Sequence, residues 1–98
     1  MGRTTAMTSK SMPINAPERD HFARVRTMPC SLCGTSGPSY AHHLREQGRR
    51  VGHFVVIPAC HACHQGPQGI HGDKTLLRLY KRTELQLLNE TLRELFND

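Results

Sequence analysis

The fold is decided by residues 30–64, which read CSLCGTSGPSYAHHLREQGRRVGHFVVIPACHACH. This stretch contains two Cys-x-x-Cys pairs, Cys30 with Cys33 and Cys60 with Cys63. The segment between the pairs is long enough for a β-hairpin, so folding can bring four thiolates to the corners of a tetrahedron. Free buried thiols are the alternative, but two matched pairs rarely arise by chance in so short a chain. We therefore predict a structural Zn²⁺ site.

The size of the chain makes such a site useful. It has 98 residues, no Trp, two Tyr and three Phe, so we expect one small domain with a thin apolar core that a metal ion would stabilise. Disulfides would instead require an oxidising compartment, and residues 1–12 lack the apolar run of a secretory signal. No stretch is apolar enough to cross a membrane. We expect a cytoplasmic protein with reduced, metal-bound cysteines and no membrane partner.

The formal net charge is +5, from Lys and Arg spread over most of the chain. This balance favours a polyanionic partner, most simply nucleic acid, through contacts with phosphates. Many basic proteins bind no nucleic acid, so the charge alone is weak evidence.

Periodicity and turn residues predict a small α+β fold, in which a polar arm at 1–14 without regular structure precedes one domain at 15–98. Asn15 is expected to cap a flanking helix within 15–29. The expected elements of the core, residues 30–72, are two metal-binding knuckles, strands at 39–44 and 54–57, a basic loop at 45–52 and a helix that begins at the second knuckle.

Two helices are expected in residues 73–98. Asp73 can cap a helix over 74–82, and Thr83 with Gln86 forms a capping box for a second helix that ends near Phe96. A bend between them is expected because their apolar stripes are out of phase. The stripe of the last helix consists of Leu85, Leu88, Leu92 and Leu95. Packing against the domain is the preferred interpretation, and a homodimer through this helix is the alternative.

Histidines lie at the edges of the cysteine pairs. His42 and His43 are adjacent within the first expected strand, and His64 follows Cys63 directly. This order of elements resembles the zinc-clamped HNH, or ββα-metal, endonucleases, and its layout is similar to phage recombination endonuclease VII. Within that superfamily, the sequence pattern from Ala41 to Gly72 most resembles small phage and prophage nucleases related to the RecA-dependent Ref nuclease.

The resemblance implies a metal-dependent DNA endonuclease of low sequence specificity that acts in phage or prophage DNA recombination or processing. His43 would be the general base that deprotonates water. His42 and His64, with His71 as a third candidate, would bind a catalytic divalent cation. The family favours Mg²⁺ or Mn²⁺, whereas imidazole ligands suit Mn²⁺, Ni²⁺ or Zn²⁺. DNA is the implied partner, in duplex, single-stranded, branched or recombinase-coated form.

The chain departs from the family pattern in three places. The middle Asn of the HNH name is absent, and His53 lies nearest to its place. A ligand one helical turn after His64 would fall at Gln68, so His71 can serve only if the intervening segment loops out. Adjacent strand residues point to opposite faces, so His42 and His43 can share a site only at a strand end or bulge.

Other interpretations compete with these assignments. The adjacent histidines can be a partly buried polar pair, His64 can replace a cysteine as a zinc ligand, and His71 can be a surface or helix-capping residue. His21 and His61 are expected to face solvent. Arg45, Arg49 and Arg50 can contact DNA phosphates or merely solvate their loop; Arg45 lies two residues from His43 and so on its face of a strand.

Two other classes of function are open. The run Cys60-His-Ala-Cys63-His64 matches the signature of covalent haem attachment, but that interpretation leaves Cys30 and Cys33 unexplained. The stronger competitor is a non-catalytic, zinc-stabilised module that binds DNA or RNA. It predicts salt-sensitive binding without strand cleavage.

Overall fold

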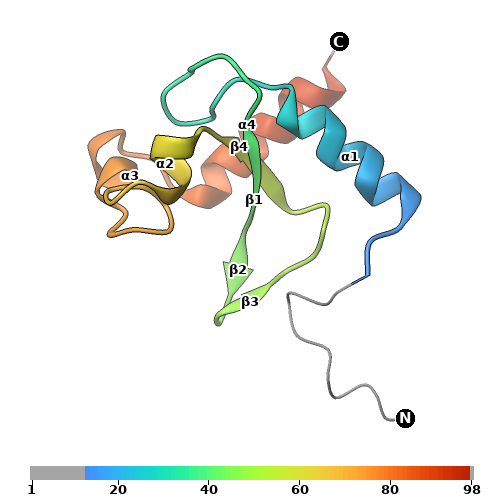
Figure 1. The fold of residues 1–98 in the computed structure, drawn as a ribbon, viewed down its shortest axis with the longest axis horizontal. Helices are drawn as coiled ribbons and strands as arrows, with labels where there is room; N and C mark the ends of the chain where they lie inside the picture. Colours follow the sequence, from blue (N-terminus) through green and yellow to red (C-terminus); the bar gives the residue numbers. More distant parts are fainter. Residues whose placement is uncertain (1–12, 98) are drawn as a thin grey trace.

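The computed structural model describes residues 13–97 and has a small α+β fold (Figure 1). Residues 1–12, most of the predicted arm, lie outside the described residues. The elements in chain order are α1 (Ala16–Arg26), β1 (Tyr40–His43), β2 (Arg45–Glu46), β3 (Arg49–Arg50), β4 (Val56–Ala59), α2 (His61–Gln65), α3 (Thr75–Leu79) and α4 (Glu84–Phe96). No helix in the described part of the chain is long and apolar enough to span a lipid bilayer.

The centre of the fold is an antiparallel pair of strands, β1 and β4. His42 pairs with Ile57 and His43 with Val56, and all four residues of β4 are buried. The second strand lies two residues beyond its expected position at 54–57. Pro58 pairs with Ala41, and its carbonyl accepts hydrogen bonds from the backbone N–H and the hydroxyl of Ser31. These bonds tie the first knuckle to the strand pair.

The expected basic loop forms a second, smaller ribbon, β2 paired with β3. Gln47 and Gly48 at its tip both have positive φ, 52° and 80°, as tight hairpin turns require. Figure 1 shows this ribbon extending away from the helices. The basic side chains of the ribbon are therefore carried on a projecting arm of the domain.

One helix precedes the strand pair in the sequence and the others follow it, as predicted. The Asn15 side chain accepts from the Glu18 N–H at 2.8 Å, which begins α1, and the predicted capping box of Thr83 and Gln86 begins α4. The predicted helix at 74–82 is shorter than expected: it covers Thr75–Leu79, because Lys74 has a left-handed φ of 64°. The predicted bend follows it, with Lys81 at a φ of 55°.

The leucine stripe predicted for α4 is partly wrong. Leu87, outside that stripe, is completely buried, whereas Leu85 is 69% exposed; Leu88 and Leu92 are half-buried. The helix is turned so that Glu84, Leu87 and Thr91 share the inward side. A search for apolar periodicity misses this side because two of its three residues are polar.

Candidate metal centres

Four cysteines gather where the two knuckles meet. The sulfur atoms of Cys30, Cys33, Cys60 and Cys63 all lie within 4.8 Å of one another, and the four residues are free thiols. The sulfurs of Cys33 and Cys60 are 3.7 Å apart. A tetrahedral ion with Zn–S bonds of about 2.3 Å would hold its sulfurs about 3.8 Å apart. The donor set and its spacing therefore suit a structural Zn²⁺.

The surroundings of the sulfur atoms shift the pKa values of the thiols in different directions. Burial opposes ionisation of Cys33, but hydrogen bonds with Thr35 outweigh it and lower the pKa of the Cys33 thiol to about 6. Burial raises the pKa of both Cys60 and Cys63. Four ionised thiolates at neutral pH thus require a bound cation, which is the usual behaviour of a structural zinc cluster.

A second cluster consists of His42, His64 and His71, whose ligand atoms also lie within 4.8 Å of one another. Their ring centroids are separated by 5.1 Å for His42 and His64, 4.8 Å for His42 and His71, and 4.6 Å for His64 and His71. His42 comes from β1, His64 from α2 and His71 from the loop after α2. Three imidazoles at this spacing can hold a second metal ion.

The loop that carries His71 folds back onto α2. The backbone N–H groups of Ile70 and His71 donate to the carbonyls of Cys63 and His64, at 2.8 and 2.9 Å. This approach requires glycine, because a Cβ at Gly69 would lie 2.6 Å from the Cys63 oxygen and one at Gly72 only 2.2 Å from the Pro67 oxygen. The predicted looping out of this segment is thus present, and it brings His71 beside His64.

The orientation of His42 is fixed by Glu84, the first residue of α4. The Nε2 atom of His42 lies 2.9 Å from Oε1 of Glu84. This hydrogen bond outweighs burial and lowers the pKa of the Glu84 carboxyl, so at neutral pH the carboxylate can only accept and Nε2 of His42 must donate. The Nδ1 atom of His42 then carries a lone pair. This Nδ1 atom is buried and has no hydrogen-bond partner in the described structure. The same holds for Nδ1 of His64. Two buried ring nitrogens without a hydrogen-bond partner therefore belong to residues of this cluster.

The other two rings of the cluster, His64 and His71, are neutral. Burial, followed by the neighbouring imidazoles of His42 and His71, lowers the pKa of His64 to about 4. Burial also lowers the pKa of His71. Both rings are consequently uncharged at neutral pH, the state in which imidazole binds metal.

We expect Glu84→Gln to weaken binding of a divalent ion at the histidine cluster by about 10- to 100-fold, because carboxylates that orient a metal-binding imidazole have effects of this size. Isothermal titration of zinc-loaded protein with Ni²⁺ or Mn²⁺ would measure the change. Glu90→Gln is the matched control, since Glu90 lies on the same helix but pairs with Arg82. Equal affinities of the two variants would contradict the orienting role of Glu84.

His43 lies at the end of β1 and faces a different set of residues. Its Nε2 atom is 3.1 Å from Nδ1 of His53, which is buried. The Phe22 ring of α1 packs edge-on against both imidazoles, with ring centroids 5.3 and 5.6 Å away. His53, near the place of the missing Asn, thus contacts His43 directly. The contact fixes the ring of His43 and leaves its Nδ1 atom as the nitrogen that is not engaged by His53.

One cavity joins His43 to the histidine cluster. It has a volume of about 230 Å³, and its lining includes His42, His43, Arg45, His71, Lys74 and Glu84. Burial and then the nearby charge of Arg50, with smaller effects from His53, His42 and Arg45, lower the pKa of His43 to about 4. The side chains of His42 and His43 diverge, as adjacent strand residues must, yet both reach this cavity because β1 ends at His43.

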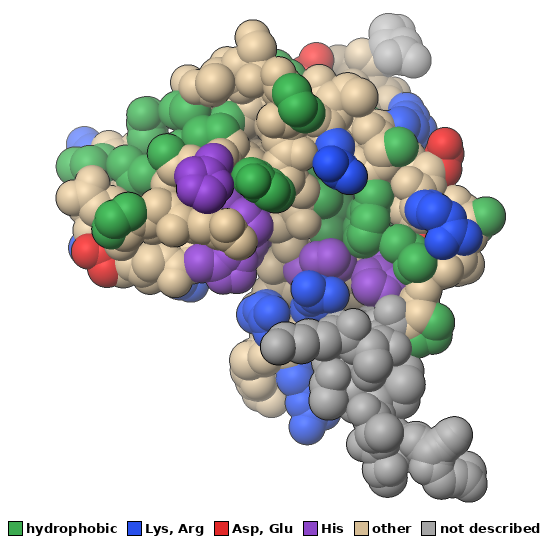
Figure 2. Space-filling view, viewed as in Figure 1, with side chains coloured by type: hydrophobic (Ala, Val, Ile, Leu, Met, Phe, Trp, Pro, Cys, Tyr) green, Lys and Arg blue, Asp and Glu red, His purple; other side chains and the backbone are tan. Residues whose placement is uncertain are grey.

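Basic side chains surround this cavity. Arg45 lines it and donates to the Gly48 carbonyl at 3.1 Å, while Arg49 and Arg50 lie on β3 of the same ribbon. Figure 2 shows Lys and Arg side chains gathered over the β2–β3 ribbon, next to a row of histidines. Of the three arginines, Arg45 lines the histidine cavity, and Arg49 and Arg50 lie on the strand paired with that of Arg45.

The comparisons name no relative. No protein-family model matches this chain, and comparison with curated proteins and with solved structures found no match. The evidence for function is therefore the geometry of the residues themselves: a four-cysteine cluster, a histidine cluster, and His43 beside the latter.

Sequence reasoning did not identify Glu84 and Phe22 as residues that contact these histidines. His21 was predicted to face solvent, which is wrong: it is buried and contacts the Phe54 ring edge-on at 5.4 Å. A histidine on the apolar side of α1, one residue before Phe22, was the available signal. His61 is exposed, as predicted.

Proposed function

We propose that this protein is a zinc-stabilised, metal-dependent DNA endonuclease of the HNH type, with low sequence specificity. The observation that carries the proposal is the cavity shared by His43 and the histidine cluster, with Arg45 at its wall. Its lining includes the neutral imidazole of His43, two of the three potential metal ligands, His42 and His71, and the cations of Arg45 and Lys74. Phosphodiester hydrolysis needs such a set: a base for water, charge stabilisation for phosphate, and fixed geometry.

His43 would accept the proton of the attacking water. In the tautomer in which its Nε2–H donates to Nδ1 of His53, Nδ1 of His43 is the atom that would receive the proton. A pKa of about 4 makes a weak base, but part of that lowering comes from Arg50 and Arg45. A DNA phosphate bound between those arginines would offset their charge and move the pKa of His43 back toward neutrality, where general bases work best.

The other residues would hold the substrate and the ion. His42, His64 and His71 fit a divalent cation that, when bound, supplies Lewis-acid stabilisation of a phosphate oxygen and the leaving 3′-oxygen. Glu84 keeps His42 in the tautomer whose Nδ1 lone pair is available. Arg45, Arg49 and Arg50 would contact successive backbone phosphates, which carry no sequence information, so little sequence preference is expected.

A nicking assay tests the function directly. Zinc-loaded protein should convert supercoiled plasmid to the nicked form with Mg²⁺, Mn²⁺ or Ni²⁺ and not in EDTA. His71→Ala should lower the rate at least about tenfold, because ligands of a catalytic metal are needed for its placement. The matched control is His61→Ala, since His61 is exposed and lies outside the histidine cluster.

The substrates include single-stranded DNA, a branched junction and single-stranded DNA coated with a recombinase filament. Salt-sensitive binding to these DNAs with no cleavage of any of them, in any of the three metals, would contradict the endonuclease. That outcome would instead support a non-catalytic, zinc-stabilised nucleic-acid-binding module.

A further inference from the structure

A mainly apolar cavity adjoins the histidine cavity, between the β2–β3 ribbon and the first turn of α4; we call it the Leu85 cavity. Its volume of about 360 Å³ lies within the range of about 300–1,000 Å³ that is typical of ligand sites. Arg45 and Glu84 line both cavities, so a ligand held in one can extend into the other. The remaining lining of the Leu85 cavity consists of Leu44, Glu46, Val51, Val55 and Leu85.

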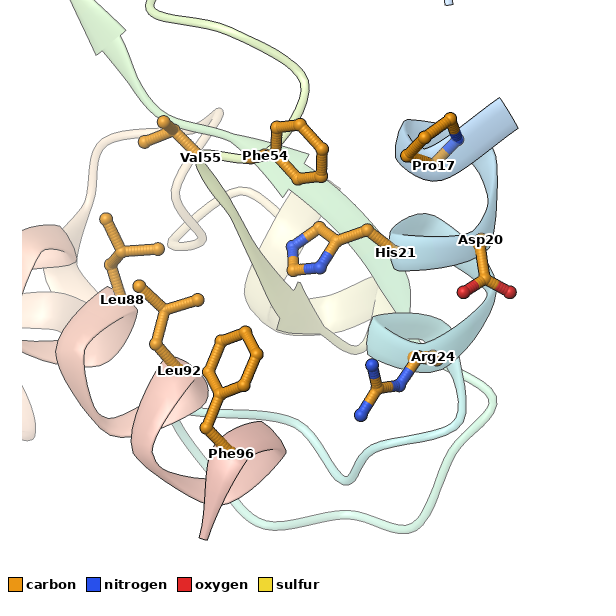
Figure 3. Close-up of a pocket in the computed structure, with 9 residues that line it drawn as sticks. All are labelled: Pro17, Asp20, His21, Arg24, Phe54, Val55, Leu88, Leu92 and Phe96. Carbon is orange, nitrogen blue, oxygen red and sulfur yellow. The ribbon is translucent and has the colours of Figure 1, made fainter. Parts of the chain in front are cut away.

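A further apolar cavity, between α1 and α4, lacks this connection (Figure 3). Among the described residues, its lining has Val55 in common with the Leu85 cavity and no residue in common with the histidine cavity. In Figure 3 the side chain of Val55 points away from Phe54, which lines only the α1 side. Of these two apolar cavities, the Leu85 cavity is therefore the one that can hold part of a ligand whose other part lies beside the histidines.

The floor of the Leu85 cavity is apolar because the backbone of Leu44 is bonded within the protein. Its N–H donates to the Val55 carbonyl at 3.0 Å, and its carbonyl accepts from the Val51 N–H at 3.2 Å. Leu44 is 8% exposed, whereas Val51 and Leu85 are 50% and 69% exposed. Two large apolar side chains are thus accessible to a ligand at the rim, directly beside a polar site.

The charges in the lining indicate where an anionic group can bind. The Glu84 carboxylate lies 2.9 Å from His42 and 3.4 Å from Lys74, so Lys74 offsets its charge. The exposed carboxylate of Glu46 would repel a phosphate, whereas Arg45 would attract one at the boundary with the histidine cavity. A ligand that spans both spaces therefore carries its negative charge at Arg45 and an uncharged group against Leu85.

A nucleotide unit of DNA has this composition, since its phosphate is joined through a sugar to a flat, uncharged ring. In a duplex the rings are paired and stacked in the interior, so a base can enter a cavity of the protein only when it is unpaired. We infer that the Leu85 cavity is a nucleobase subsite, which holds one unpaired base beside the phosphate that Arg45 contacts. This inference rests on the proposed endonuclease function and specifies its substrate class as DNA with unpaired nucleotides. Aliphatic walls contact the face of any base, so sequence specificity stays low.

Fluorescence anisotropy with zinc-loaded protein, in the absence of Mg²⁺, Mn²⁺ and Ni²⁺, tests binding separately from cleavage. The two probes are a single-stranded oligodeoxythymidylate and an abasic chain with the same number of phosphates. The oligodeoxythymidylate should bind about tenfold more tightly, because burial of a base removes apolar surface from water while the phosphate contacts of the two probes are alike. Equal dissociation constants would overturn the inference.

Leu85→Asn should reduce this preference to about twofold or less, because the amide replaces apolar surface at the rim. Leu79→Asn is the matched control, since Leu79 is 67% exposed, lies on α3 and does not line the cavity. The control should keep the tenfold preference, and both variants should bind the abasic chain as the wild type does. An undiminished preference in Leu85→Asn would count against the subsite.

Methyl NMR of the full, zinc-loaded chain locates the base. Oligodeoxythymidylate should shift the methyl resonances of Val51 and Leu85, whereas the abasic chain and a blunt duplex should leave them in place. Equal shifts with the duplex would exclude a site for unpaired bases. A dimer in sedimentation that Leu85→Asn dissociates would also refute the inference, since a second copy would then cover the cavity.

The nicking assay distinguishes a failure of this inference from a failure of the proposed function. A protein that nicks plasmid but shows neither the methyl shifts nor the preference over the abasic chain lacks the subsite. A protein that shows both but nicks no DNA has the subsite and lacks the proposed activity.

Discussion

Cys30→Ala should leave the chain unfolded at 25 °C. Apparent binding free energies of about 10–16 kcal/mol for structural zinc in small domains equal or exceed the net stability of about 5–15 kcal/mol of a typical native protein. Cys30 is buried in a small apolar core whose large side chains are all Leu or Ile: Leu32, Leu44, Ile57, Ile70, Leu77 and Leu87. Loss of one ligand therefore removes both the ion and part of the core.

Circular dichroism on heating and a zinc count by native mass spectrometry would measure this loss. The variant should show no cooperative transition and less than one zinc per chain, and a strong chelator should produce the same state in the wild type. Ser36→Ala is the control, since Ser36 is exposed and lies in the same loop. A variant without zinc that melts at the wild-type temperature would exclude a structural metal.

His43→Ala should lower the rate of DNA nicking by about 10²- to 10⁴-fold, the usual contribution of a general base. The thermal transition should change little, because His43 is only half-buried and its partner His53 remains covered by Phe22. Single-turnover cleavage of plasmid with saturating Mn²⁺ would measure the effect, and filter binding at several salt concentrations would show that affinity for DNA is retained. A variant that cleaves at the wild-type rate would remove His43 from the reaction.

The four-cysteine cluster could be predicted from the sequence because its signal is local: two residues separate the members of each pair. The strand pair and the capping box of α4 have equally short signals. The hydrogen bond between His42 and Glu84 has no such signal, since 42 positions separate the two residues. The hydrogen bond becomes visible only when the inward side of α4 is known. That side contains the polar residues Glu84 and Thr91, so a search for apolar periodicity does not find it.

His71 and His21 illustrate two further limits. The seven residues from His64 to His71 would equal two helical turns, but α2 ends at Gln65, and the close backbone approach at Gly69 and Gly72 brings the rings together instead. The polar character of histidine favoured an exposed position for His21, but packing against Phe54 decided otherwise. In both cases tertiary contacts, rather than local preference, set the position of the side chain.

Cys63 and His64 are adjacent in the chain, and they belong to different candidate metal centres. One peptide bond joins a ligand of the first cluster to a ligand of the second, and the carbonyls of both residues hold the loop that carries His71. An ion at the cysteines thus helps to position two of the three histidines. The affinity of the histidine cluster for its ion should depend on occupancy of the cysteines. The two ions would then bind in a fixed order: zinc would bind the cysteines first, and the second metal would bind the histidines afterwards.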